Sequence, residues 1–128
     1  MKIRIALLLP LLLTIAKVST AQSFAGVWRG TSLCQVKNSS CNDERVVYHI
    51  SEGSSRDSYQ IVASKVIGGK ENDMGTLYFT WDPKRKILFL IDSVKQVKWE
   101  FKISGKEMHG TLISKGNLYR VIDLKREN

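Results

Sequence analysis

Apolar and polar residues alternate with a period of two along most of the chain after residue 22. The clearest segment is Val97–Ile103, in which every odd position is apolar and every even position is charged. Because successive side chains of a strand point to opposite faces, this alternation predicts a β-strand with one buried face. The same reasoning predicts eight strands: Phe24–Thr31, Arg45–Ser51, Ser58–Ser64, Gly75–Trp81, Lys86–Asp92, Val97–Ile103, Lys106–Ser114 and Leu118–Lys125.

The segments between these strands are short and have the composition of turns. Gly, Asp, Asn and Ser concentrate in Glu52–Asp57, Gly68–Asn72 and Asp82–Arg85, and again around Gly105 and Gly116. Short connections between successive strands predict an all-β, antiparallel up-and-down meander. Closing such a meander on itself removes its exposed edges, so we expect a small barrel, with an open sandwich of two sheets as the alternative. An eight-stranded barrel has an interior that side chains fill or that holds one small ligand.

The N-terminus has the pattern of a cleavable signal peptide. Two basic residues, Lys2 and Arg4, precede an apolar run that ends at Ala16, and Ser19 and Ala21 are small residues at the −3 and −1 positions of a cleavage site. We therefore expect residues 1–21 to be a signal peptide and 22–128 to be a single domain that is secreted or periplasmic. No apolar run in 22–128 is long enough to span a bilayer as a helix, so no integral membrane segment is expected after cleavage.

The net charge of the chain is moderately basic and constrains its partners only in part. The full chain has 20 basic and 12 acidic residues and a net charge of +8; cleavage after Ala21 would remove three basic residues and leave +5. Basic residues gather on the fifth to seventh predicted strands and their turns: Lys84, Arg85, Lys86, Lys95, Lys98, Lys102 and Lys106. A surface for nucleic acid needs exposed aromatic residues among such charges, and the aromatic residues of the predicted inward faces point away from them. We expect a solvated face and no nucleic-acid partner.

The two cysteines, Cys34 and Cys41, are separated by six residues. In an exported protein this pair is most simply a structural disulfide that closes a small loop. A redox or metal-binding pair is the alternative, but the spacing is not Cys-x-x-Cys and the chain has no histidine cluster to complete a zinc site. We predict a disulfide, no metal site and no cofactor.

The first predicted strand contains Gly26-Val27-Trp28, and the last contains Arg120. These residues resemble the calycin group, which includes lipocalins and the avidin-like and fatty-acid-binding barrels. The resemblance implies a small barrel in which Trp28 plugs the closed end and Arg120 packs over it. The chain is also similar to short secreted bacterial proteins of unassigned activity that have a tryptophan near the mature start and a two-cysteine loop.

Arg120 shares its predicted inward face with Leu118, Ile122 and Leu124. A buried arginine needs a partner. Trp28 is one candidate partner, through a cation–π contact, and a carboxylate from Asp43 or Glu44 is another. A third role for Arg120 is to anchor the head group of a ligand. The aromatic residues predicted to point inward would form the lining of a ligand site: Trp28, Tyr48, Tyr59, Phe79, Trp81, Trp99 and Phe101. The pattern leaves open whether they enclose a cavity or form a packed core.

His49 and His109 are the only histidines, and both fall on faces predicted to point outward. The favoured function is therefore a non-enzymatic barrel that binds a small apolar or amphiphilic ligand. The alternative is an interaction or inhibitor protein that acts through its loops around a packed core. A small hydrolase that uses one of the histidines as acid or base is a remote third hypothesis. The sequence identifies no particular ligand or protein partner.

Overall fold

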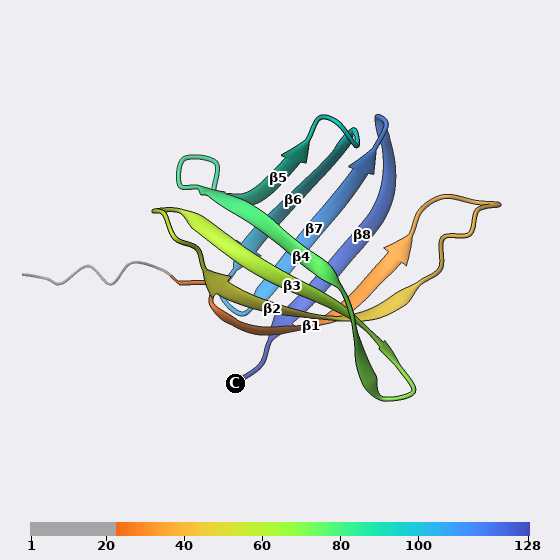
Figure 1. Ribbon diagram of the computed structural model, residues 1–128, viewed down its shortest axis with the longest axis horizontal. Helices are drawn as coiled ribbons and strands as arrows, with labels where there is room; N and C mark the ends of the chain where they lie inside the picture. Colours follow the sequence, from red (N-terminus) through yellow and green to blue (C-terminus); the bar gives the residue numbers. More distant parts are fainter. Residues whose placement is uncertain (1–22) are drawn as a thin grey trace, which may run out of the picture.

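The computed structural model describes residues 23–128, so the predicted signal peptide, residues 1–21, lies outside the described part (Figure 1). Eight strands make up the fold: β1 (Gly26–Cys34), β2 (Glu44–Glu52), β3 (Ser58–Ile67), β4 (Lys70–Asp82), β5 (Ile87–Asp92), β6 (Val97–Ser104), β7 (Glu107–Ser114) and β8 (Asn117–Arg126). The described residues include no helix of the length and apolarity needed to cross a bilayer.

Each strand pairs antiparallel with the next one along the chain, and β8 pairs with β1 to complete a closed barrel (Figure 1). The predicted up-and-down meander is confirmed, and the alternative of an open sandwich is wrong. The closing pair runs from Trp28 opposite Arg126 to Cys34 opposite Arg120. This register places the two ends of β8 at opposite ends of the barrel, which decides the roles of its two inward arginines.

The buried core follows the predicted alternation except at Leu118, whose predicted inward position is wrong: it is 44% exposed, beyond the point where the pairing of β7 with β8 shifts register. Inward positions of β2, Val46, Tyr48 and Ile50, are buried, and on β6 the Phe101 side chain is completely buried. Gly110 leaves room for that ring, because a Cβ atom on Gly110 would lie 2.3 Å from it. A glycine in a strand often marks such a close approach. One aromatic side chain of β6 therefore fills the space that its neighbour on β7 leaves empty.

The largest departure from the predicted boundaries is in β4, which begins at Lys70 instead of Gly75. Gly68 and Gly69 form a tight hairpin turn with φ values of 57° and 77°, the backbone that two-residue hairpins require. The strand then continues through the charged stretch 71–73, which lacks the alternation of a half-buried strand because its side chains are exposed on both faces. Periodicity does not detect a strand that has no buried face.

The outer half of the β3–β4 hairpin bends away from the ring of strands. A β-bulge interrupts the pairing between Ala63 and Ser64, and bulges bend a strand and increase its twist. The hairpin then lies over the outer face of β2, where Glu71 Oε1 is 2.7 Å from His49 Nε2. Val47, on that outer face, is fully buried.

Because of this bend, one pair of neighbouring strands shares only a short run of paired residues, which we call the seam between β4 and β5. β4 and β5 pair only at Thr80–Phe89, Trp81–Leu88 and Asp82–Ile87. Towards the other end their hydrogen-bonding edges separate, as the diverging ribbons of β4 and β5 show (Figure 1). The barrel is therefore closed at the end that contains Trp28 and open at the end that contains the Cys34–Cys41 loop.

We expect Gly110→Ala to lower the free energy of unfolding by about 1–3 kcal/mol, because the added methyl group must displace the Phe101 ring in a packed core. Urea denaturation followed by circular dichroism measures this loss. Thr111→Ala is the control, since the neighbouring side chain lies on the other face of the strand. Equal stability of Gly110→Ala and the wild type would contradict the proposed contact.

Candidate ligand-binding site at the open end of the barrel

The open half of the barrel contains a cavity of about 290 Å³. Its walls combine apolar side chains with one polar cluster, and the residues come from seven of the eight strands: Ser32, Glu44, Val46, Tyr48, Ala63, Met74, Gly75, Leu77, Trp99, Leu112 and Arg120. The volume is at the lower end of the range of about 300–1,000 Å³ that is usual for ligand pockets. The interior is thus packed at the closed end and hollow at the open end.

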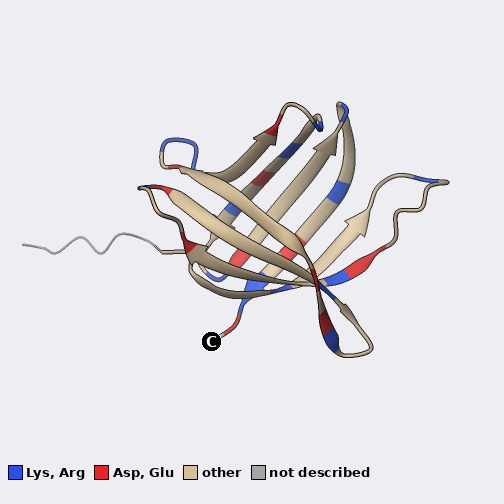
Figure 2. Ribbon diagram, in the orientation of Figure 1, with Lys and Arg blue, Asp and Glu red and all other residues tan. Residues whose placement is uncertain are grey.

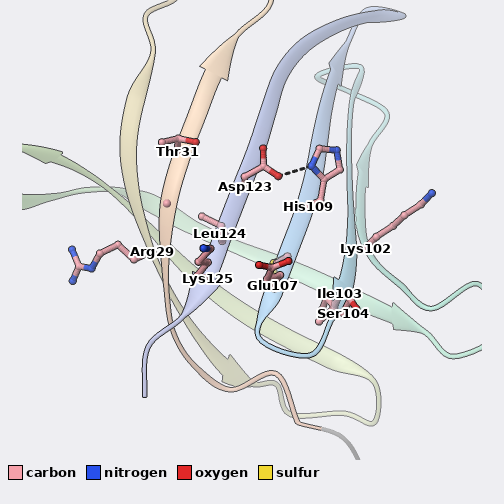
Figure 3. Close-up of a pocket in the computed structure, with 12 residues that line it drawn as sticks. Arg29, Thr31, Lys102, Ile103, Ser104, Glu107, His109, Asp123, Leu124 and Lys125 are labelled. Carbon is pink, nitrogen blue, oxygen red and sulfur yellow. Dashed lines mark hydrogen bonds and ion pairs between the residues drawn. The ribbon is translucent and has the colours of Figure 1, made fainter.

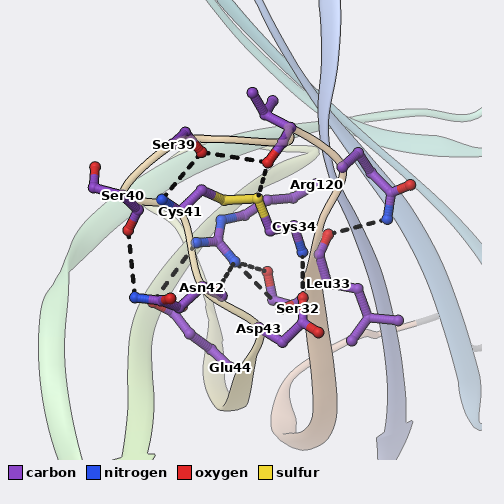
Figure 4. Close-up of a disulfide and its surroundings, with 12 residues drawn as sticks. Ser32, Leu33, Cys34, Ser39, Ser40, Cys41, Asn42, Asp43, Glu44 and Arg120 are labelled. Carbon is purple, nitrogen blue, oxygen red and sulfur yellow. Dashed lines mark hydrogen bonds and ion pairs between the residues drawn. A yellow bond between two sulfur atoms is a disulfide. The ribbon is translucent and has the colours of Figure 1, made fainter.

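Arg120 is the centre of the polar cluster (Figure 4). One terminal nitrogen donates to the carbonyl oxygen of Ser32 at 3.2 Å, to the hydroxyl oxygen of Ser32 at 3.2 Å and to the carbonyl oxygen of Asn42 at 3.0 Å. The other terminal nitrogen lies 3.7 Å from Glu44 Oε1. The side chain is only 12% exposed, so these acceptors replace most of the water that the guanidinium loses.

Of the two carboxylates predicted as partners of Arg120, the structure selects Glu44. The Asp43 carboxylate instead accepts a hydrogen bond from the backbone nitrogen of Cys34 at 2.8 Å. Neighbouring residues at the start of β2 thus have separate roles, since Asp43 holds the end of β1 while Glu44 faces the cavity. The alternation of a strand explains the difference, because consecutive side chains point in opposite directions.

The predicted contact between Arg120 and Trp28 is wrong. The guanidinium carbon of Arg126 lies 5.7 Å from the centre of a Trp28 ring, and Arg126 also donates to the carbonyl oxygens of Ser23 and Ala25. Arg120 is six residues away along β8, about 20 Å at the rise of a strand. Arg126 was missed because the last strand was predicted to end at Lys125, one residue before it.

The predicted disulfide between Cys34 and Cys41 is present, with Cα atoms 5.9 Å apart. It lies beside the Arg120 guanidinium (Figure 4), and the loop it closes leads directly into Asn42, whose carbonyl oxygen Arg120 binds. The bridge therefore fixes one of the acceptors that position the arginine. In the chain-entropy model a loop this short contributes about 2.5 kcal/mol to stability.

Tyr48 adds a buried hydroxyl to the cavity wall. Burial raises the pKa of this phenol well above its usual value; the nearby Arg120 charge lowers the pKa and Glu44 raises it, but burial dominates. The hydroxyl therefore stays neutral across the physiological range. It offers a ligand one donor and one acceptor in an apolar wall.

The predicted aromatic lining divides into two groups. Tyr48 and Trp99 line the cavity, and Phe79 and Phe101 pack against them, with Phe101 ring centres 6.1 Å from Tyr48 and 6.3 Å from Trp99. Tyr59 and Trp81 instead pack on Phe24, with ring centres 5.4 and 4.6 Å from that of Phe24. They belong to the same core as Trp28. Met74, Leu77 and Leu112 also line the cavity and were not among the predicted ligand-binding residues.

Both histidines lie on the outer face, as predicted, but each has a carboxylate partner that the sequence did not reveal. His109 Nδ1 is 2.6 Å from Asp123 Oδ1, and the pair lines a depression of about 460 Å³ on the outer surface (Figure 3). Asp123 stands opposite Thr31 on one side and His109 on the other. The carboxylate therefore separates the hydroxyl from the imidazole, whereas nucleophilic catalysis needs the imidazole next to the hydroxyl.

The basic residues of β5, β6 and their turns are interleaved with acids. Arg85 Nε lies 2.8 Å from Asp82 Oδ2, and Lys98 Nζ lies 3.0 Å from Glu100 Oε1. Hydrogen bonds from Arg85, from its side chain first and its backbone second, lower the pKa of the Asp82 carboxyl. These pairs break up the positive surface that the sequence indicated.

The stability of the protein should decrease above pH 10 partly because of Tyr48. The phenol ionises near pH 10 in the unfolded chain but stays neutral in the fold, so its contribution is complete below pH 10 and is lost as the pH rises. Between pH 9 and pH 11 the free energy of unfolding of the wild type should fall by about 1 kcal/mol more than that of Tyr48→Phe. Urea denaturation of both proteins at the two pH values tests this, and identical losses would contradict it.

Removing the disulfide should loosen the polar cluster. We expect the double variant Cys34→Ser, Cys41→Ser to lose about 2.5 kcal/mol of stability while keeping its β-sheet circular dichroism signal. Amide hydrogen exchange should increase at position 34 and at Arg120, which pair between β1 and β8. It should remain unchanged at Trp28, at the other end of the barrel. Uniform loss of protection in all strands would show that the bridge supports the whole barrel and not the open end alone.

Comparisons with protein-family models, curated proteins and solved structures find no match to this chain. The closed antiparallel barrel of eight strands is compatible with the calycin resemblance at the level of fold.

Proposed function

We propose that the protein is a non-enzymatic barrel that binds one small amphiphilic molecule in its open half. The observation that carries this proposal is a cavity of about 290 Å³ whose apolar walls converge on Arg120, Glu44 and Tyr48. Ligand sites typically combine a mostly apolar lining with a few polar groups that set the orientation of the ligand. The cavity supports this proposal over a packed barrel that acts only through its loops.

The hydrogen bonds of Arg120 indicate which chemical group the ligand presents. One terminal nitrogen of the guanidinium already serves three protein acceptors, whereas the other has only Glu44 at 3.7 Å, beyond the length of a good hydrogen bond. A carboxylate or carbonyl oxygen of the ligand would complete the set of acceptors around this second nitrogen. The apolar part would then contact Trp99 and Leu112.

The disulfide supports the proposal that the barrel works outside the cytoplasm, because such bridges persist in oxidising compartments. Export through the predicted signal peptide is part of the same proposal. The cavity of the barrel would enclose part of the ligand in a preformed site.

The test compares two arginines on the same strand and face. Octanoate and benzoate are the probes, because each joins a carboxylate to a small apolar body. Arg120→Met should weaken the binding of the better probe about tenfold or more, since a hydrogen bond to a charged group contributes about 1.5–3 kcal/mol. Arg126→Met, at the closed end, should change the affinity by less than about twofold. Isothermal titration calorimetry measures both.

A second measurement checks the cavity itself. Leu112→Trp should fill part of the hollow interior and reduce probe binding, while circular dichroism verifies that the barrel remains folded. Native mass spectrometry of protein from its own host should reveal a small co-purified molecule. The proposal fails if neither probe binds the wild type and no bound species is found, or if the two arginine variants behave alike.

A further inference from the structure

Large exposed apolar side chains are concentrated towards the open end of the barrel, with Tyr78, on β4 opposite Gln60, as the exception. Seven are exposed among the described residues: Leu33, Ile67, Met74, Tyr78, Ile91, Val94 and Leu118. The connections at the closed end, 53–57, 83–86 and 105–106, contain none of them. Single exposed apolar residues are ordinary, whereas a group gathered at one end of a protein indicates a binding surface.

Four of these side chains belong to one continuous structure, which we call the open rim and define as residues 33–37, 91–96 and 115–119. The backbone nitrogen of Lys115 donates to the carbonyl oxygen of Gln96 at 2.9 Å, and that of Gln35 donates to Tyr119 at 2.9 Å. These bonds join the β5–β6 turn to the β7–β8 turn and the start of β8 to the disulfide loop. Leu33, Ile91, Val94 and Leu118 therefore lie along a single edge of the molecule.

Each of the three rim segments also contains an exposed lysine: Lys37, Lys95 or Lys115. The positive residues stand at the tips of the turns and of the disulfide loop (Figure 2). Their ammonium groups take part in no ion pair within residues 23–128.

The nearby acids are already engaged. Asp92 accepts a hydrogen bond from the backbone nitrogen of Lys95 at 3.0 Å, and Asp43 accepts one from Cys34. The positive charge of the rim is therefore available to an external anion.

Two turns of the same construction show that the apolar tip is not a requirement of the fold. Asp82–Lys86 and Asp92–Gln96 each begin with an aspartate that accepts a hydrogen bond from the backbone nitrogen of the fourth residue, and each ends with a residue at φ 54°. Lys84 occupies the third position at the closed end and Val94 occupies it at the rim, where 92% of the valine is exposed. A polar residue clearly suits this position, so the structure of the turn does not explain the valine.

We propose that the open rim docks on the surface of a membrane containing anionic lipids. Val94, Ile91 and Leu118 enter the boundary between head groups and acyl chains, and the three lysines lie beside the anionic head groups. Apolar side chains flanked by unpaired lysines match this boundary, which is apolar on one side and negatively charged on the other. The proposal goes beyond ligand binding and does not rest on it, because the rim side chains lie outside the cavity lining.

Sedimentation with lipid vesicles tests the proposal. The vesicles consist of phosphatidylcholine alone or of phosphatidylcholine with 30% phosphatidylglycerol, a fraction on the order of that in anionic biological membranes. The wild type should sediment with the anionic vesicles and much less with the neutral ones, and salt should weaken the interaction by screening the lysines. Lys95→Glu should reduce binding about tenfold or more, and Val94→Asp should also reduce it.

Lys84→Glu is the matched control, because it makes the same change of charge on the equivalent turn of the closed end. It should change vesicle binding by less than about twofold, and Arg120→Met should bind vesicles like the wild type even if it has lost octanoate. The proposal is overturned if the wild type does not prefer anionic vesicles, or if Lys84→Glu weakens binding as much as Lys95→Glu. Binding of the rim to a protein and not to vesicles would also overturn it.

Discussion

The seam between β4 and β5 is the constraint on which the rest of this barrel depends. A closed antiparallel sheet leaves no strand edge exposed when every strand forms backbone hydrogen bonds with both of its neighbours. Here β4 and β5 are joined by only three residue pairs. The bulge between Ala63 and Ser64 turns the β3–β4 hairpin outwards and draws β4 away from β5. The closed end retains a dense aromatic core, while the open end keeps space that side chains do not fill.

The two inward arginines of β8 show how this asymmetry is used. Arg126 lies over Trp28 at the closed end and completes a packed floor. Its half-buried charge is tolerated because backbone carbonyls accept its hydrogen bonds. Arg120 lies beside a cavity and keeps one nitrogen without a close protein acceptor. The same residue type on the same face therefore has a structural role at one end and is available to a ligand at the other.

Much of the fold could be predicted because a strand with one buried face shows an alternation of apolar and polar residues in its own short stretch of sequence. The residues of Val97–Ile103 were assigned to the correct faces, and so was Arg120. Lys70–Asp73 was not recognised as strand, because its side chains are exposed on both faces and therefore show no alternation. The predicted partner of Trp28, Arg120, was wrong for a different reason. Which arginine of β8 reaches Trp28 depends on the register between the first and last strands.

The candidate site was only partly accessible from the chain. The inward parity of Tyr48, Trp99 and Arg120 is a local property that the period of a strand determines, so the amino-acid pattern was sufficient to find these residues. Whether they enclose space depends on the bulge in β3–β4 and on how far β4 and β5 remain paired, which involves strands distant from most of the lining. Parity is set by covalent geometry one residue at a time, whereas a cavity is set by the closure of the whole ring, and only the folded barrel contains that information.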